Sequence, residues 1–438
     1  MIRYFAPFLA VIGLLFGTAS ASATEIKTVT TPAGIEAWFV QEPSIPIISV
    51  KLSFNGGSAM DPHGLEGLAN MASGLFDEGA GDMPSLEYQT RMEELAISIS
   101  FDSSKDNFSV SLRTLTKNRD EAFRLLGLAL NQPRFDDKAV ERVRRQILSG
   151  LENDIENADA IVGKVWMKTM FGDHVYGRPT RGTKESVAAI SKSDLQGFAS
   201  SRFGRDNLIV GAVGDIDAAE LARLLDNALA TLPAKSTPAS VPEVKAKSTG
   251  SLTVIRKPNP QSTVMFGMPG IKRDDPDYYI AYVMNYVLGG GGFTSRLYQE
   301  VREKRGLAYS VYSYLYPYQH SAIYLGGVAT ANERVAESLK VIKAEISRMA
   351  GKGVTADELS RAKTYLNGSF PLRLDSNAKI ATMLAAIQIS DLPIDYIDRR
   401  PGYINAVTIE DIQRVAKRLL RTDAMTFVIV GDPKDIDG

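Results

Sequence analysis

The sequence predicts an α+β fold of two homologous domains, each an antiparallel-rich sheet packed with helices. Three observations indicate this fold. Segments typical of strands and helices mix without strict βαβ order, a polar linker divides the chain, and the parts on either side of it resemble each other. The length of 438 residues suits two domains, and 44% hydrophobic residues is enough for packed cores.

Strand-like segments open each part of the chain, and helical segments follow. The first part has the alternating segment IISVKLSFNGGSA, residues 47–59, which ends at a Gly-Gly turn. The second part opens with the alternating segments SLTVIRK and STVMFGM. Helical periodicity follows in LEGLANMASGLF and DKAVERVRRQILSGLENDI of the first part, and in YYIAYVMNYVL and RVAESLKVIKAEISRMA of the second.

The ends of the two parts match without a gap. SKSDLQGFASSRFGRDNLIVGAVGD and TIEDIQRVAKRLLRTDAMTFVIVGD each read as a capped amphipathic helix, a basic turn and a buried strand that closes on Gly-Asp. In this alignment Asp194 matches Asp411, and Gly214 matches Gly431. A period this long indicates a duplicated domain rather than a solenoid repeat.

The linker between the two parts is residues 234–250, AKSTPASVPEVKAKSTG. It is rich in Pro, Ser and Lys and has no hydrophobic period. We therefore expect an N-terminal domain at residues 24–233 and a C-terminal domain at residues 251–438.

Residues 1–23 read as a signal peptide that is cleaved near Ala23. Arg3 gives a positive start, FAPFLAVIGLLFG is a short apolar core, and Ala21-Ser22-Ala23 is a small-residue cleavage site. The apolar run is too short to span a bilayer comfortably, and no cysteine follows it for a lipid anchor. We expect export to the periplasm without a stable membrane anchor.

The composition excludes several classes of site. The absence of cysteine rules out disulfides, thiol catalysis and cysteine-ligated zinc. Only three histidines are present: His63, His174 and His320. Lys and Arg number 50 against 51 Asp and Glu, so no basic excess indicates a nucleic-acid partner.

One fragment, HGLEG, has part of a metal-binding pattern. A helical HxxEH places two His ligands one turn apart with a Glu beside them. His63 and Glu66 have the right spacing, but Gly67 stands where the second His would be. We expect a helix from Leu65, so His63 and Glu66 would not share one regular helical face. We interpret His63 as a surface loop residue and not as a ligand.

Four longer stretches carry a resemblance to a known family. They are GGSAMDPHGLEGLANM, FGDHVYGRPTRGTKESV, GGFTSRLYQEVREKRGLAYSVYSY, and AVTIEDIQRVAKRLL followed by FVIVGD. In this order they resemble the pitrilysin-type zinc peptidases, which include insulysin, the mitochondrial processing peptidase and small two-domain bacterial members. The resemblance runs from about Glu25 to Asp432 and implies the fold of these peptidases in both domains.

The resemblance also implies where zinc ligands would stand. The family's HxxEH follows a triplet that matches residues 67–69, so its ligands and base fall on Asn70, Ser73 and Gly74. These positions share one helix face, but none holds His or Glu. The family's further Glu ligand falls near Ser149-Gly150, which also offers no ligand. We expect this chain to bind no zinc.

A second set of family residues is present. In REKRGLAY, Arg302 and Tyr309 match an Arg and a Tyr that, in active members, hold the substrate backbone and stabilise the oxyanion. We expect Arg302 late on a helix that Gly306 ends, and Tyr309 at the start of the next strand.

Tyrosines are dense after this pair. They stand at positions 309, 312, 314, 316, 318 and 324. Strand alternation predicts Tyr312, Tyr314 and Tyr316 on the face opposite Tyr309, some of the group in the core. Tyrosine suits peptide binding, and a peptide could also add to an exposed strand edge.

Together these patterns imply a zinc-free subunit of a periplasmic heterodimeric zinc metallopeptidase. A homologous partner would carry HxxEH and zinc, and this chain, inactive alone, would supply Arg302 and Tyr309 to peptide substrates. The alternative is a non-catalytic structural or peptide-binding protein of the same family. An autonomous peptidase is disfavoured, because Asn70 and Gly74 stand where the family has His.

Overall fold

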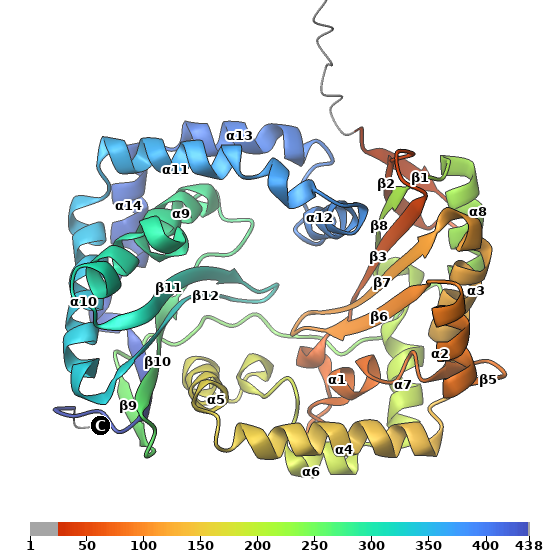
Figure 1. The fold of residues 1–438 in the computed structure, drawn as a ribbon, viewed down its shortest axis with the longest axis horizontal. Coiled ribbons are helices and arrows are strands. Elements are labelled where there is room, and N and C mark those ends of the chain that lie inside the picture. The colour runs from red at the N-terminus through yellow and green to blue at the C-terminus, as the bar shows by residue number, and fades with distance from the viewer. Residues whose placement is uncertain (1–24, 437–438) are drawn as a thin grey trace, which may run out of the picture.

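The computed structural model describes residues 25–436, so the predicted signal peptide lies outside the described residues. Two sheets organise the fold (Figure 1). The first has the order β1-β2-β8-β3-β7-β6, and the second has the order β11-β12-β10-β13-β9. Both are mixed sheets with mostly antiparallel pairs, and helices pack on both, which confirms the predicted α+β class.

The first half contains residues up to the end of α8. Its strands are β1 (Lys27–Thr30), β2 (Glu36–Gln41), β3 (Ile47–Asn55), β4 (Gly79–Ala80), β5 (Met83–Pro84), β6 (Ser98–Ser103), β7 (Asn107–Leu115) and β8 (Leu208–Gly214). Its helices are α1 (Leu68–Ser73), α2 (Ser85–Glu94), α3 (Arg119–Asn131), α4 (Asp137–Asp154), α5 (Ala158–Phe171), α6 (Lys184–Ala189), α7 (Lys192–Arg202) and α8 (Ala218–Leu229).

The second half begins at β9, after a stretch without helix or strand. Its strands are β9 (Leu252–Arg256), β10 (Gln261–Pro269), β11 (Ala308–Pro317), β12 (Ala322–Ala331) and β13 (Thr426–Gly431). Its helices are α9 (Tyr278–Asn285), α10 (Val335–Lys352), α11 (Ala356–Gly368), α12 (Asn377–Ile389), α13 (Tyr396–Ala406) and α14 (Ile409–Leu419), with π-helical segments at Tyr286–Gly290 and Tyr298–Glu303.

The duplication seen in the sequence is present in the fold. The order β2-β8-β3-β7-β6 of the first sheet corresponds to β9-β13-β10-β12-β11 of the second, and each has one parallel pair in the same place. Asp194 and Asp411 both close capping boxes, at the start of α7 and α14. Gly214 and Gly431 end the equivalent strands with φ angles of 156° and 155°.

One helix of each half packs on the sheet of the other half. α5 of the first half packs on β10 and β13 of the second sheet, and α12 of the second half packs on β8 and β3 of the first (Figure 1). The Trp166 indole N–H of α5 donates to the Thr426 carbonyl at 3.3 Å, and Gln388 of α12 donates to the Val210 carbonyl at 3.0 Å. Each half therefore contributes one helix to the packing of the other half's sheet.

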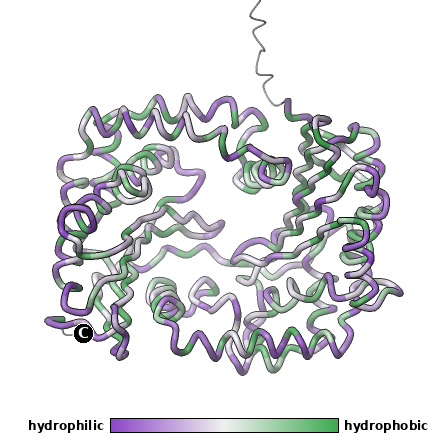
Figure 2. The backbone as a smooth tube through the Cα atoms, in the orientation of Figure 1, coloured by the Kyte–Doolittle hydropathy of each residue, from purple (hydrophilic) through white to green (hydrophobic). Residues whose placement is uncertain are grey.

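Glycines make room for both of these helices. A Cβ at Gly267 of β10 would come within 2.7 Å of the Trp166 ring, and one at Gly211 of β8 would collide with the backbone of Ala381 in α12. The apolar side chains form one large core in each half and two smaller cores where α5 and α12 meet the opposite sheets. Along the outer helices hydrophobic and hydrophilic residues alternate, as expected for amphipathic helices (Figure 2).

The tip of the β11–β12 hairpin is fixed to the first half. The Tyr176 hydroxyl donates to Asp106 at 2.6 Å and accepts from the His320 N–H at 3.1 Å. The Gln319 N–H donates to the other Asp106 oxygen at 3.0 Å, and the Tyr318 ring stacks on Tyr176 with centroids 4.6 Å apart. These contacts, which we call the hairpin clamp, tie a strand of the second sheet to a turn of the first.

The helix expected from Leu65 instead begins at Leu68. Gly67 has φ +97°, which ends any helical path on its N-terminal side, and HGLEG lies in the preceding turns. The Asp61 carboxylate accepts from the Gly67 and Ala69 N–H groups at 3.1 and 3.2 Å and so caps the helix start.

Asp61 also forms a buried ion pair. The Arg202 guanidinium lies 3.5 Å from the carboxylate, and both side chains are at most 5% exposed. Arg202 donates further hydrogen bonds to the carbonyls of Gly56, Gly57 and Met60. Burial raises the pKa of Asp61 to about 7, and the Arg202 charge acts in the opposite direction.

We expect Asp61→Ala to lower the free energy of unfolding by about 3–5 kcal/mol at pH 8, because the Arg202 charge would stay buried without its partner. Denaturant titration followed by circular dichroism measures this. The control is Asp173→Ala, which removes an exposed pair with Lys168 and should change stability by less than about 1 kcal/mol. Equal effects of the two substitutions would contradict the role assigned to Asp61.

Candidate functional site

Arg302 and Tyr309 lie together in the second half, as the sequence predicted. Arg302 belongs to the π-helical segment Tyr298–Glu303, and Gly306, with φ +60°, turns the chain into β11. The Arg302 guanidinium carbon lies 4.9 Å from the centre of the Tyr309 ring and 4.8 Å from that of the Tyr298 ring. The cation is thus held against two aromatic faces, an arrangement that fixes its position without neutralising its charge.

A β-bulge displays Tyr309 to solvent. Ala308 pairs with Thr330 and Ser310 with Ala329, so Tyr309 is the extra residue of β11. Tyr309 is 81% exposed as a residue, and the Arg302 side chain is 31% exposed with one ion pair, to Glu303 at 3.6 Å. A phenol O–H and a guanidinium that both reach solvent at one corner can bind a carbonyl oxygen or a developing oxyanion.

The remaining tyrosines of β11, and Tyr318 in the turn after it, extend from this corner. We call Tyr309, Tyr312, Tyr314, Tyr316 and Tyr318 the tyrosine row. The sequence predicted Tyr312, Tyr314 and Tyr316 on the face opposite Tyr309. This prediction does not hold, because the bulge at Tyr309 interrupts the alternation. Ala308, Val311 and Ser313 are the buried residues of β11, while Tyr312, Tyr314 and Tyr316 are 37%, 51% and 48% exposed.

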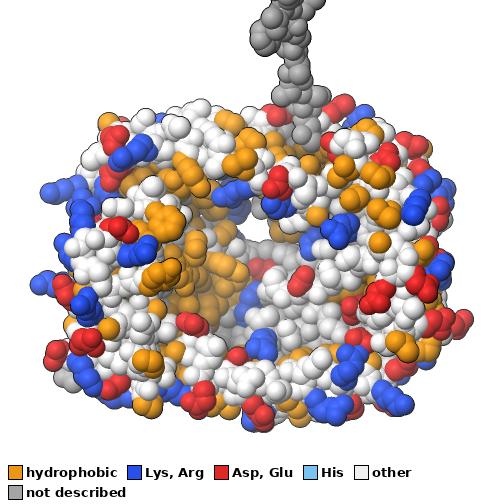
Figure 3. Space-filling model, viewed as in Figure 1, with side chains coloured by type: hydrophobic (Ala, Val, Ile, Leu, Met, Phe, Trp, Pro, Cys, Tyr) orange, Lys and Arg blue, Asp and Glu red, His pale blue; other side chains and the backbone are white. Residues whose placement is uncertain are grey.

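The tyrosines that do enter the core are elsewhere. Tyr324 of β12 is fully buried, and its hydroxyl donates to Ser313 at 2.7 Å. In the space-filling view a hollow lies in the middle of the molecule, and hydrophobic side chains gather on its wall where β11 and β12 lie in Figure 1 (Figure 3). Tyr312, Tyr314 and Tyr316 therefore lie on the exposed face of β11.

The positions that the resemblance matches to zinc ligands lie in α1, at its C-terminal end and in α4 of the first half. Asn70 is half-buried, the Ser73 hydroxyl donates to the Asn70 carbonyl at 2.8 Å, and Gly74 ends the helix. No hydrogen bond or ion pair among residues 25–436 joins these residues to Arg302 or Tyr309. The structure thus separates the two sets of predicted site residues into different halves.

A guanidinium lies beside Gly150, which the resemblance matches to the remaining ligand position. A Cβ at Gly150 of α4 would collide with the Arg181 guanidinium, which pairs with Asp154 at 2.7 Å. The Arg181 carbonyl in turn lies 2.7 Å from where a Cβ of Gly67 would be, just before α1. These positions do not suit a zinc ion, because they offer an amide, a hydroxyl that is already hydrogen-bonded and a glycine, with a cation nearby. The sequence did not single out Arg181, since nothing local marks a contact 31 residues from Gly150.

His63 and Glu66 form no metal site either. His63 is exposed in the turn before α1, and Glu66 accepts from the Gly64 N–H at 3.2 Å. Within residues 25–436 no group of three or more His, Asp or Glu side chains is placed to hold a metal. In the same residues no helix is both long and apolar enough to cross a membrane.

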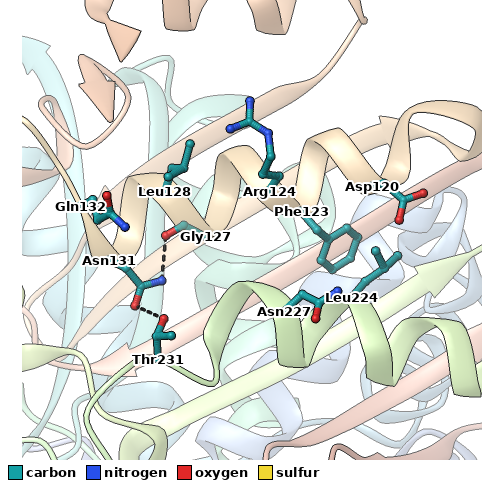
Figure 4. A pocket seen from close by; sticks show the side chains of 10 residues that line it. All are labelled: Asp120, Phe123, Arg124, Gly127, Leu128, Asn131, Gln132, Leu224, Asn227 and Thr231. Carbon is teal, nitrogen blue, oxygen red and sulfur yellow. Dashed lines mark hydrogen bonds between the residues drawn. The ribbon is translucent and has the colours of Figure 1, made fainter. Parts of the chain in front are cut away.

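A cavity of about 430 Å³ lies elsewhere, in the groove between α3 and α8 (Figure 4). Asn131 of α3 donates to the Gly127 carbonyl at 2.7 Å and accepts from Thr231 at 2.9 Å, while Phe123 and Leu224 face each other across the helices. Because these polar groups are already satisfied, we interpret this cavity as a packing groove and not as the site of chemistry.

Comparison with known families agrees with the geometry. The model described as "Insulinase (Peptidase family M16)" matches residues 38–184, and the one described as "Peptidase M16 inactive domain" matches residues 189–366. Both models belong to the same family, and they match consecutive parts of the chain: the second match begins in the first half, before α7 and β8, and ends in α11.

Relatives of nearly the same length are similar over the whole chain. "Non-peptidase homolog YmxG" of Helicobacter pylori is 28% identical over 429 residues, 97% of each chain, and an "Uncharacterized zinc protease" of Streptomyces coelicolor is 26% identical over 417 residues, 94% of this chain and 90% of that one. The crystal structure of a "peptidase M16 inactive domain" from Pseudomonas fluorescens superposes with a TM-score of 0.88 at 28% identity, covering 94% of this chain and 99% of that one. With its duplicated α+β halves and its two consecutive matches, the chain belongs to peptidase family M16, the pitrilysin or insulinase family.

Proposed function

We propose that this protein is the zinc-free subunit of a heterodimeric metallopeptidase and supplies Arg302 and Tyr309 to a partner subunit. The main support is the exposed corner where the Arg302 guanidinium lies 4.9 Å from the Tyr309 ring. A second support is the state of the zinc positions, where Asn70, Ser73 and Gly74 offer no suitable ligands. The partner, a homologue with HxxEH, would bring the zinc and the base.

The two side chains would have different tasks in the complex. The hydroxyl of Tyr309, a residue that is 81% exposed, would donate a hydrogen bond to the oxyanion of the attacked peptide group. Arg302, steadied between the rings of Tyr298 and Tyr309, would bind a nearby substrate carbonyl. Neither task requires this chain to hold a metal.

The second candidate function is peptide binding or a structural role without proteolysis. The name of the Helicobacter pylori relative, "Non-peptidase homolog", favours it. In this case the same corner would bind peptides, and no partner would turn binding into cleavage. The two candidates are separated by reconstitution with a zinc-bearing homologue.

We also propose that the protein is exported to the periplasm, on the basis of the signal-like residues 1–23. Mass spectrometry of the periplasmic fraction should find a mature chain that begins near Thr24. An intact N-terminus in the cytoplasmic fraction would contradict export.

The protein purified alone should contain no stoichiometric zinc, because the ligand positions hold Asn70, Ser73 and Gly74, and Arg181 lies against Gly150. Elemental analysis of the purified chain measures this. Near-stoichiometric zinc that disappears in His63→Ala or Glu66→Ala would show that HGLEG is a ligand motif after all.

Mixed with a homologue that carries HxxEH, the protein should give a peptidase that neither chain shows alone. Tyr309→Phe should lower turnover of the complex by about 10²–10³-fold, because one oxyanion donor is lost. Arg302→Ala should also raise the Michaelis constant, because it loses a contact with the bound substrate. Steady-state kinetics of the reconstituted pair measures both effects.

Gel filtration of each variant with the partner provides the control for assembly. Tyr365→Phe, which removes a hydroxyl from another exposed tyrosine on α11, is the matched control and should leave turnover unchanged. If Tyr309→Phe and Arg302→Ala assemble and cleave peptides like the wild type, the proposed roles are wrong and the non-proteolytic function is favoured.

A further inference from the structure

We propose that a small tetrahedral oxyanion, of the phosphate or sulfate type, binds between the first sheet and α12 of the second half. The site is a cavity of about 70 Å³ on the face of the sheet that points away from the core of the first half. It is separate from the corner of Arg302 and Tyr309, and its occupation depends neither on a partner subunit nor on catalysis.

The cavity is lined by cations and hydroxyl groups. Its polar lining consists of two basic residues and four hydroxyl residues: Lys51, Arg113, Ser49, Ser98, Ser111 and Thr382. No Asp or Glu of the described chain is among its lining residues. Basic side chains and hydroxyl donors that converge without an acid are the groups with which proteins bind an oxyanion.

The strand register brings these side chains to one face of the sheet. Arg113 of β7 lies between Ser49 of β3 and Ser98 of β6. In the next row Lys51 of β3 lies opposite Ser111 of β7. Lys51 and Arg113 are therefore diagonal neighbours on adjacent strands, a relation that places residues roughly 7–8 Å apart. Like charges at this spacing repel each other unless an opposite charge lies between them.

The two cations have no carboxylate partner of their own. Within residues 25–436 neither Lys51 nor Arg113 has an Asp or Glu oxygen within 4.0 Å, and the Lys51 ammonium donates to the Ser111 hydroxyl at 3.0 Å. Burial lowers the pKa of Lys51, and the charge of Asp102 on β6 acts in the opposite direction from beyond that distance. An anion between the two cations would offset both the burial of the ammonium and the repulsion.

Ser49 provides an independent observation that points to a ligand. The residue is 2% exposed, and its hydroxyl has no hydrogen-bond partner among the described residues. It is also one of the residues that line the cavity. A buried hydroxyl without a partner costs free energy, and an anion oxygen in the cavity would accept its hydrogen bond.

The size of the cavity selects a small ion. α12 packs on β8 and β3 (Figure 1) and covers the cavity with Ala378 and Ala381, whose short side chains leave space above the sheet. A volume of about 70 Å³ holds a few water molecules or one small ion, and it excludes a peptide or a nucleotide. A tetrahedral dianion has enough oxygens to meet both cations and the Ser49 hydroxyl, whereas a carboxylate has two oxygens and one charge.

The test titrates the mature full-length chain with sodium sulfate and with sodium phosphate by isothermal titration calorimetry, at an ionic strength held constant with chloride. Each anion should saturate one site per chain. Lys51→Gln and Arg113→Gln should each weaken binding by at least about tenfold, because each removes a charge-assisted hydrogen bond. Acetate should bind at least about tenfold more weakly than sulfate, because it carries a single charge.

Lys138→Gln is the matched control, because Lys138 is exposed on α4 and lies outside the cavity. It should bind sulfate like the wild type. Equal weakening in this control, unchanged binding in Lys51→Gln and Arg113→Gln, or titrations without a saturable site would overturn the proposal. Acetate that binds as tightly as sulfate would also overturn it.

Ser49→Ala separates binding from folding. Without sulfate it should melt at or above the wild-type temperature, because its hydroxyl has no partner to lose. With sulfate at about tenfold its dissociation constant, the wild type should melt a few degrees higher, and Ser49→Ala should gain less. An equal gain in the two proteins would contradict the placement of the ion in this cavity.

Crystals grown with selenate, a tetrahedral dianion whose selenium scatters anomalously, give the position directly. The anomalous peak should lie between Lys51 and Arg113. A peak there without saturable binding in solution would be an adventitious ion only and would overturn the proposal. None of these measurements uses a zinc-bearing partner, so their outcome is independent of the reconstitution experiment.

Discussion

The exchange of α5 and α12 between the two halves is the packing on which the rest of the structure depends. Each helix covers the sheet of the opposite half, and each meets a glycine there, Gly267 under Trp166 and Gly211 under α12. Because both sheets need a helix from the other half to bury their apolar faces, neither half has a complete core alone. A hollow lies in the middle of the molecule (Figure 3).

Two arginines show how the duplicated scaffold has come to differ between its halves. In the first half Arg181 occupies the space beside Gly150, the residue that the resemblance matches to a ligand position, and pairs with Asp154. In the second half Arg302 rests on aromatic rings and keeps its charge available. Residues 25–436 place no group of three or more His, Asp or Glu side chains that could hold a metal, and in the second half a guanidinium and a phenol reach solvent at one corner.

The sequence predicted features that depend on local signals. The duplication was indicated by the capping residues Asp194 and Asp411 and by the glycines that end the equivalent strands. Gly306 predicted the turn between Arg302 and Tyr309. Features set by distant contacts were missed. The late start of α1 depends on the positive φ of Gly67 and on a cap from Asp61, and the bulge that re-aims Tyr309 has no sequence signature of its own. The exchange of helices between halves likewise leaves no periodic trace.

The hairpin clamp has a consequence for how wide the molecule opens. β11 belongs to the second sheet, yet its tip is bonded to Asp106 and Tyr176 of the first half. A rigid swing of one half away from the other would have to break these buried hydrogen bonds together with the contacts of both exchanged helices. The two halves therefore do not separate easily to open the hollow. A chain without stable tertiary structure enters it more easily than a folded domain.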